Sequence, residues 1–119
     1  MDKVRLDTSF VNEKWIKENY PNERSSDDKR IELLVKQAEL LNGQIAIVEE
    51  NSGFTDDKNI TFYGLEDDKV YKEYVWLIEQ DDFIGTYSER EKFDKDWDNG
   101  EYESDVIFTI PRVFIKENV

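Results

Sequence analysis

Residues 31–50 read IELLVKQAELLNGQIAIVEE, and the pattern of apolar residues changes within this stretch. Before Gly43 the apolar residues recur every three or four positions, which predicts an amphipathic helix. They are Ile31, Leu34, Val35, Ala38 and Leu41. Gly43 is a good helix stop, and the following residues 44–50 (QIAIVEE) alternate with a period of two, as a short strand does. The chain therefore combines helix and strand around this point.

Two helices are predicted on the N-terminal side of Gly43. In the first, TSFVNEKWIKENYP (8–21), Thr8 or Ser9 is the expected N-cap, and the helix ends before Pro21. In the second, Ser25 or Ser26 is the expected cap, and acidic residues follow in the first turn, where the helix dipole favours anions.

Strands are predicted on the C-terminal side. Residues 59–65 and 70–80 are rich in β-branched and aromatic side chains, and residues 83–87 resemble a further short strand. Residues 106–116 form the last predicted strand, and Pro111 favours a bend or a sheet edge because proline cannot donate a ladder hydrogen bond.

The expected fold class is α+β, with two N-terminal helices packed on one face of a mostly antiparallel sheet of five to six strands. A length of 119 residues predicts a single domain over 1–119. Within it, 1–43 is the expected helical part and 44–119 the expected antiparallel β part.

Composition narrows the possible chemistry. The chain has no cysteine and no histidine, which excludes disulfides, thiolate chemistry and the usual neutral-pH general base. No apolar segment resembles a signal peptide or a membrane span, so we expect a cytoplasmic protein. Nothing in the sequence calls for a cofactor.

Charge is unevenly distributed along the chain. The net charge is −13, and residues 44–119 hold 8 basic and 20 acidic side chains, a net of −12. A field of that sign repels nucleic acid and anionic membranes and attracts basic proteins. We therefore expect neither direct nucleic-acid binding nor membrane binding.

Much of this charge lies in FDKDWDNGEYESDV (93–106). Asn99-Gly100 is the strongest short signal for a two-residue hairpin turn. Pairing outward from this turn places three like-charged pairs on one face, with Trp97, Tyr102 and Phe93 on the other. The acidic face comprises Asp94, Asp96, Asp98, Glu101, Glu103 and Asp105.

Three interpretations of this acidic hairpin remain open. It can be the solvated face of an edge hairpin, whose charge prevents aggregation. It can be a cation site, because Asp94, Asp96, Asp98 and Asp105 resemble positions one, three, five and twelve of an EF-hand calcium loop. The hairpin departs from that loop in having Asn99 at position six, Asp at position twelve and β-like flanks.

The third interpretation is a protein interface, and we prefer it. Carboxylates at strand spacing can occupy the phosphate sites of a basic nucleic-acid-binding cleft. The chain is similar in size and acidity to immunity proteins that neutralise nuclease toxins and to phage inhibitors of host defence nucleases. The aromatic anchors available beside the charges are Tyr87, Trp97, Tyr102 and Phe83.

No sequence feature predicts an enzyme. Glu73, in the predicted strand 70–80, is the one acid that could point inward; otherwise it is a cross-strand partner of Lys58 or Lys69. Trp15 and Trp76 are expected in the core. Arg112 and Lys116 are expected to neutralise nearby acids.

Overall fold

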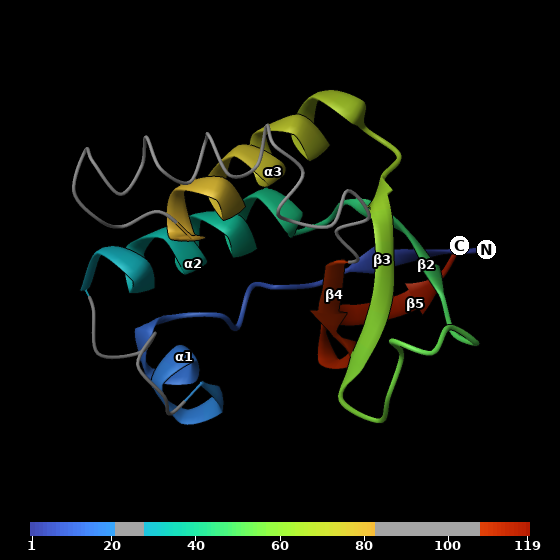
Figure 1. Ribbon diagram of the computed structural model, residues 1–119, viewed down its shortest axis with the longest axis horizontal. Helices are drawn as coiled ribbons and strands as arrows, with labels where there is room; N and C mark the ends of the chain where they lie inside the picture. Colours follow the sequence, from blue (N-terminus) through green and yellow to red (C-terminus); the bar gives the residue numbers. More distant parts are fainter. Residues whose placement is uncertain (21–27, 83–107) are drawn as a thin grey trace, which may run out of the picture.

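The computed structural model describes residues 1–20, 28–82 and 108–119, and these form an α+β fold (Figure 1). The described residues contain three α-helices and a five-stranded antiparallel sheet, which confirms the predicted class. In chain order the elements are β1 (Asp2–Leu6), α1 (Glu13–Asn19), α2 (Asp28–Leu41), β2 (Ile45–Glu49), β3 (Asn59–Leu65), α3 (Asp68–Asp82), β4 (Phe108–Pro111), a 3-10 turn (Arg112–Phe114) and β5 (Ile115–Asn118).

The sheet has the strand order β4-β3-β2-β1-β5, and every neighbouring pair is antiparallel. Strands β4 and β5 therefore lie at opposite edges, although only the three residues Arg112–Phe114 separate them in the chain. A flat five-stranded sheet would place its edges about 19 Å apart, whereas the four backbone steps from Pro111 to Ile115 span at most about 14 Å. The sheet must curl so that its two edges approach each other.

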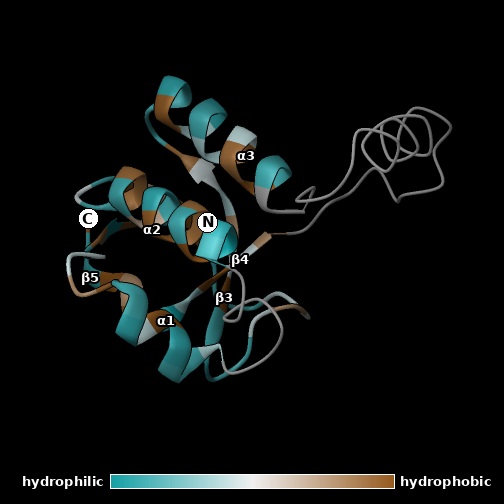
Figure 2. Ribbon diagram, turned by 90° about the vertical axis from the view of Figure 1, so that its left-hand side faces the viewer, coloured by the Kyte–Doolittle hydropathy of each residue, from teal (hydrophilic) through white to brown (hydrophobic). Residues whose placement is uncertain are grey.

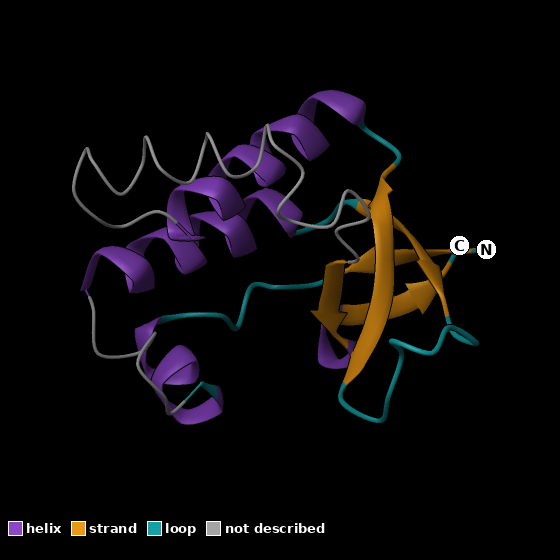
Figure 3. Ribbon diagram, viewed as in Figure 1, coloured by secondary structure: helices purple, strands orange, loops and turns teal. Residues whose placement is uncertain are grey.

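The hydrophobic core joins the curled sheet to helices α2 and α3. Alternate strand residues are buried, including Val4 and Leu6 of β1 and Ala46 and Val48 of β2. They share one cluster with Leu41 of α2 and Tyr74 of α3, and with Ile60, Phe62, Leu65, Ile110 and Phe114. In Figure 3 the three α-helices lie to one side of the strands, and in Figure 2 the helices carry both hydrophilic and hydrophobic residues.

Helix α2 ends where the sequence indicated. Its last residue is Leu41, and Gly43 has a φ of 78°, a left-handed conformation that glycine adopts without steric cost. Strands β2 and β3 also lie within the predicted ranges 44–50 and 59–65. The predicted caps Ser25 and Ser26 lie outside the described residues.

The predicted cap of the first helix is wrong. Helix α1 begins at Glu13, and Asn12 is its N-cap, accepting a hydrogen bond from the Trp15 backbone N–H at 2.9 Å. Thr8 is instead buried, with its hydroxyl donating to the Ala38 carbonyl and its backbone N–H donating to Asn42 Oδ1 at 3.1 Å. These bonds fix the connection from β1 to α1 against the end of α2.

The predicted strand over 70–80 is also wrong, because these residues belong to helix α3. Asp67 caps this helix by accepting hydrogen bonds from the backbone N–H groups of Lys69 at 3.1 Å and Val70 at 3.3 Å. The side chains of Asp68 and Lys72 then form an ion pair at 3.0 Å, one helical turn apart. A helix therefore lies within the part of the chain that was expected to be β.

The two ends of the described chain hold further strands. Strand β1 was not predicted, and it lies within the part expected to be helical, pairing with both β2 and β5. The expectation for Pro111 is confirmed, since it ends the edge strand β4. From residue 108 onward, the predicted strand 106–116 divides into β4, the 3-10 turn and the start of β5.

Gly64, in strand β3, should tolerate substitution poorly. Its φ is 151°, and an added Cβ would lie 3.6 Å from the Tyr71 ring. We expect Gly64→Ala to lower the free energy of unfolding by about 1–3 kcal/mol, because the strained backbone conformation strongly favours glycine. Urea denaturation measures this, with Gly53→Ala as the matched control, since an added Cβ there meets nothing within 4 Å. Equal losses in both variants would contradict the prediction.

Candidate functional site

The residues predicted to bind a partner cannot be placed in the fold. All nine, together with Phe83, Phe93, the predicted strand 83–87 and the cation-site alternative, fall in 83–107, outside the described residues. The nine are Asp94, Asp96, Asp98, Glu101, Glu103, Asp105, Tyr87, Trp97 and Tyr102. Two other features of the described residues are candidates for binding: a groove between α2 and α3, and a hollow lined by aromatic residues.

The first feature, the α2–α3 groove, has a volume of about 410 Å³ and is lined by Lys36, Glu39, Leu40, Glu73, Trp76 and Leu77. Trp76 is 55% exposed, which is unusual for so large an apolar side chain. The half-buried Leu40 and Leu77 extend this apolar surface between the two helices. The groove therefore presents an aromatic ring and two leucines on an otherwise polar surface.

The charge of the α2–α3 groove is negative. The ammonium group of Lys36 is paired with Glu32 on its own helix at 3.2 Å. Glu39 and Glu73 are both exposed, and neither forms an ion pair with a described basic side chain. An arginine placed over Trp76 would meet both a ring face and nearby carboxylates.

The structure corrects two predictions in this region. Trp76 is not a core residue but lies on the exposed side of α3. Glu73 neither points inward nor has a cross-strand partner, because it lies on the same helix three residues before Trp76. Trp15 does pack against the core, as predicted.

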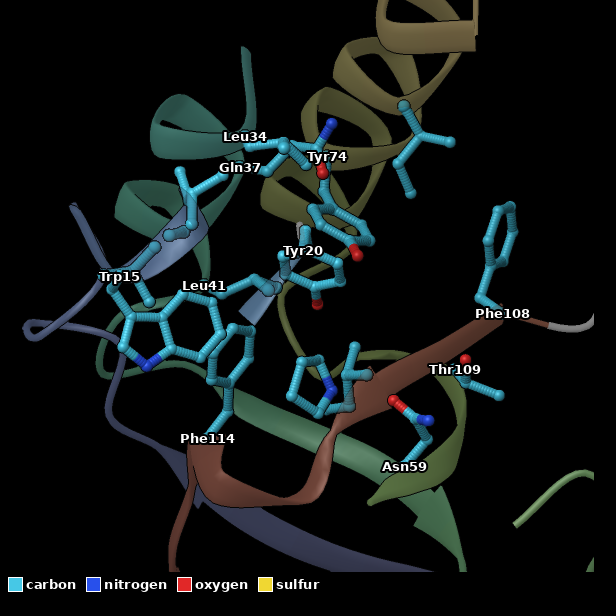
Figure 4. A pocket seen from close by; sticks show the side chains of 16 residues that line it. Trp15, Tyr20, Leu34, Gln37, Leu41, Asn59, Tyr74, Phe108, Thr109 and Phe114 are labelled. Atoms are coloured by element: carbon cyan, nitrogen blue, oxygen red, sulfur yellow. The ribbon is translucent and has the colours of Figure 1, made fainter. Parts of the chain in front are cut away.

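The second feature, the aromatic hollow, lies among α1, α2, α3 and β4 (Figure 4). Its volume is about 410 Å³. In Figure 4, Trp15 and Phe114 stand on one side of the hollow, with Phe108 and Thr109 on the other. Trp15 and Phe114 are in contact, with ring centroids 5.7 Å apart. The lining residues are Val11, Trp15, Ile16, Tyr20, Leu34, Gln37, Ala38, Leu41, Asn59, Tyr74, Ile78, Phe108, Thr109, Ile110, Pro111 and Phe114.

None of these sixteen lining side chains carries a charge, although 38% of the residues in the chain are charged. Polar groups are nevertheless present. Gln37, Asn59 and Thr109 are among the lining residues, and the hydroxyl ends of Tyr20 and Tyr74 point toward the open centre of the hollow (Figure 4). The Gln37 amide nitrogen donates to the Leu77 carbonyl oxygen at 3.4 Å, which leaves the amide oxygen as an acceptor.

Tyr74 is the most perturbed titratable residue at the hollow. Its side chain is only 6% exposed and packs edge-on against Phe62, with ring centroids 5.5 Å apart. Burial raises the pKa of the Tyr74 hydroxyl well above its ordinary value, and the neighbouring Tyr20 and Tyr71 raise it further. Tyr74 therefore acts as a neutral hydrogen-bonding group in the hollow and not as a phenolate.

The hollow has room for several water molecules, because its volume of about 410 Å³ far exceeds the share of one water molecule in the liquid, about 30 Å³. Its polar lining groups can bind water, so the hollow holds either solvent or another occupant. A pocket of this size with a few polar groups is also what a small-molecule site requires.

Arg112 neutralises acidic groups locally, as predicted. Its guanidinium group pairs with Glu50 at 2.8 Å and donates to the Asp56 carbonyl oxygen at 3.0 Å. Hydrogen bonds from the Asn59 and Lys58 backbone N–H groups lower the pKa of Asp56, and the charge of Arg112 adds to this effect. Arg112 thereby ties the 3-10 turn to the loop between β2 and β3.

Across residues 1–20, 28–82 and 108–119, no group of three or more acidic side chains is arranged to hold a metal ion. Among the helices in the same ranges, none is long and apolar enough to cross a membrane.

The chain matches no known protein family, no curated protein and no solved structure.

Proposed function

We propose that this protein is a non-catalytic acidic inhibitor that binds and neutralises a basic protein, either a nuclease toxin or another nucleic-acid-binding effector. The observation that carries the proposal is the net charge of −12 on residues 44–119. A basic cleft built for phosphates attracts such a surface, and electrostatic steering speeds their encounter. The partner's nucleic acid and the inhibitor then compete for the same cleft. A phage inhibitor of a host defence nuclease would act in the same way.

The α2–α3 groove supports this proposal within the described residues. Protein interfaces concentrate their binding energy in a few aromatic and arginine residues that lose contact with water. Trp76 is a candidate for such an anchor, because it is exposed and shares its groove with Glu39 and Glu73. An arginine of a basic partner is the side chain that best fits both the ring and the carboxylates.

The test begins with capture of a partner from the cells that produce the protein, released by a salt gradient. Wild type is compared with Asp96→Lys/Glu103→Lys in the acidic hairpin and with Glu39→Lys/Glu73→Lys in the α2–α3 groove. Glu13→Lys/Glu18→Lys on α1 is the matched control, because it changes the net charge by the same amount. We expect the hairpin variant to lose the partner, the groove variant to bind it about tenfold more weakly, and the control to retain it.

Inhibition must then be measured directly. The captured protein is assayed for nuclease activity or nucleic-acid binding, and we expect one equivalent of wild type to block it. The proposal is wrong if the captured protein keeps its full activity, or if the hairpin variant still binds it at moderate salt. A saturable calorimetric signal with calcium that the hairpin variant lacks would instead favour the cation-site interpretation of residues 94–105.

A further inference from the structure

We propose that the aromatic hollow is a binding site for a neutral, planar aromatic molecule of one or two rings. This site is separate from the α2–α3 groove, and it does not depend on the proposed inhibitor function. Three observations determine the class of ligand: the size of the hollow, its lack of charge, and the arrangement of its rings and polar groups.

The size of the hollow suits a small molecule. Its volume of about 410 Å³ is more than ten times the share of one water molecule in the liquid, about 30 Å³. It also falls in the range of small-molecule sites, about 300–1,000 Å³. The hollow therefore has room for an aromatic molecule of one or two rings.

Charge excludes ionic ligands from the hollow. No lining side chain can pair with an anion or a cation, and burial of an unpaired charge is strongly unfavourable. The net charge of −13 further disfavours anions over the whole molecule. A neutral molecule avoids both costs.

The rings and polar groups favour a flat ligand with a polar edge. Trp15 and Phe114 lie with ring centroids 5.7 Å apart on one side, and the Phe108 ring lies on the other side (Figure 4). Aromatic ligands pack well in edge-on and offset contacts with such rings. Tyr74, held neutral by burial, can donate a hydrogen bond to the ligand, and the Gln37 amide oxygen can accept one.

Indole is a suitable probe because it is neutral and planar and carries one N–H donor. We expect indole to produce saturable NMR shifts at Tyr74, Phe108 and Phe114 of the full chain. Under the same conditions, indole-3-acetate and tryptamine, the anionic and cationic counterparts, should bind at least about tenfold more weakly. Cyclohexanol should also bind more weakly, because it lacks an aromatic ring.

A variant distinguishes this site from the α2–α3 groove. Leu34 of α2 is half-buried, lines the hollow and does not belong to the core cluster, so Leu34→Trp should narrow the hollow without disturbing the core. We expect Leu34→Trp to weaken indole binding by at least about tenfold. Leu34→Met, which nearly conserves the side-chain volume, is the matched control, and Trp76→Phe in the groove should bind as wild type does.

Three results would overturn the proposal. The first is an absence of saturable shifts up to the solubility limit of indole. The second is unchanged binding by Leu34→Trp, provided that the dispersed amide spectrum of this variant shows that it is folded. The third is loss of binding in Trp76→Phe, which would place the ligand in the α2–α3 groove. None of these results bears on capture of a basic partner, so the two proposals fail independently.

Discussion

Phe62→Ala should lower the free energy of unfolding by about 3–5 kcal/mol, the largest loss we expect from any single truncation in this protein. Phe62 is 2% exposed, and its ring contacts those of Tyr71 and Tyr74 at centroid distances of 5.9 and 5.5 Å. It lies in β3 and joins the sheet to α3 through these two rings. Its removal therefore opens a cavity at the contact between the two layers.

Urea denaturation followed by far-ultraviolet circular dichroism measures this loss, and Phe54→Ala is the matched control. Phe54 is 58% exposed, so its truncation should change the free energy of unfolding by no more than about 0.5 kcal/mol. Because a domain of this size is stable by only about 5–15 kcal/mol, Phe62→Ala should lose a large share of this stability and unfold at a clearly lower urea concentration than wild type. Similar losses in the two variants would show that α3 does not pack on β3 through Phe62.

The sequence predicted those elements whose local signals agree. Helix α2 has an apolar stripe at helical spacing and a glycine stop, and both signals act within the segment itself. Strands β2 and β3 have short apolar runs bounded by turns. These elements require no information from distant parts of the chain.

Helix α3 was missed because composition and spacing disagreed. Its valine and aromatic residues are typical of strands, yet Tyr71, Tyr74 and Ile78 also lie at helical spacing. The length of 15 residues and the Asp67 cap were the better signals, since strands rarely exceed ten residues. Strand β1 shows a clean alternation of Val4 and Leu6 with basic residues, but it is only five residues long.

The candidate sites were less predictable than the fold, because each depends on residues brought together from distant elements. The α2–α3 groove brings together Glu39 of α2 and Glu73 of α3. The wrong strand assignment of residues 70–80 had also placed the exposed Trp76 in the core. The aromatic hollow joins Trp15 of α1 to Phe114, which follows β4. No spacing in the sequence indicates such contacts, because they follow from how the helices cover the curled sheet.

Alkaline pH should destabilise the protein through Tyr74. Burial raises the pKa of this hydroxyl in the folded state, while in the unfolded chain it keeps its ordinary value near 10. Between these two values the unfolded chain releases the proton and the folded protein retains it. Ionisation of Tyr74 therefore leaves the free energy of unfolding unchanged below about pH 10. As the pH rises further, it lowers the free energy of unfolding by up to about 1.4 kcal/mol per pH unit.

Tyr74→Phe tests this linkage, since phenylalanine fills most of the same space and does not titrate. Urea denaturation at about pH 8 and about pH 11 should show a clearly smaller loss of stability in Tyr74→Phe than in wild type. Tyr63→Phe is the matched control: the hydrogen bond to Glu49 raises the pKa of Tyr63, but its side chain is exposed. Between these two pH values, Tyr63→Phe should lose nearly as much stability as wild type does. If Tyr74→Phe loses as much stability as wild type, the hydroxyl at the hollow ionises freely, and the phenol is not held neutral by burial.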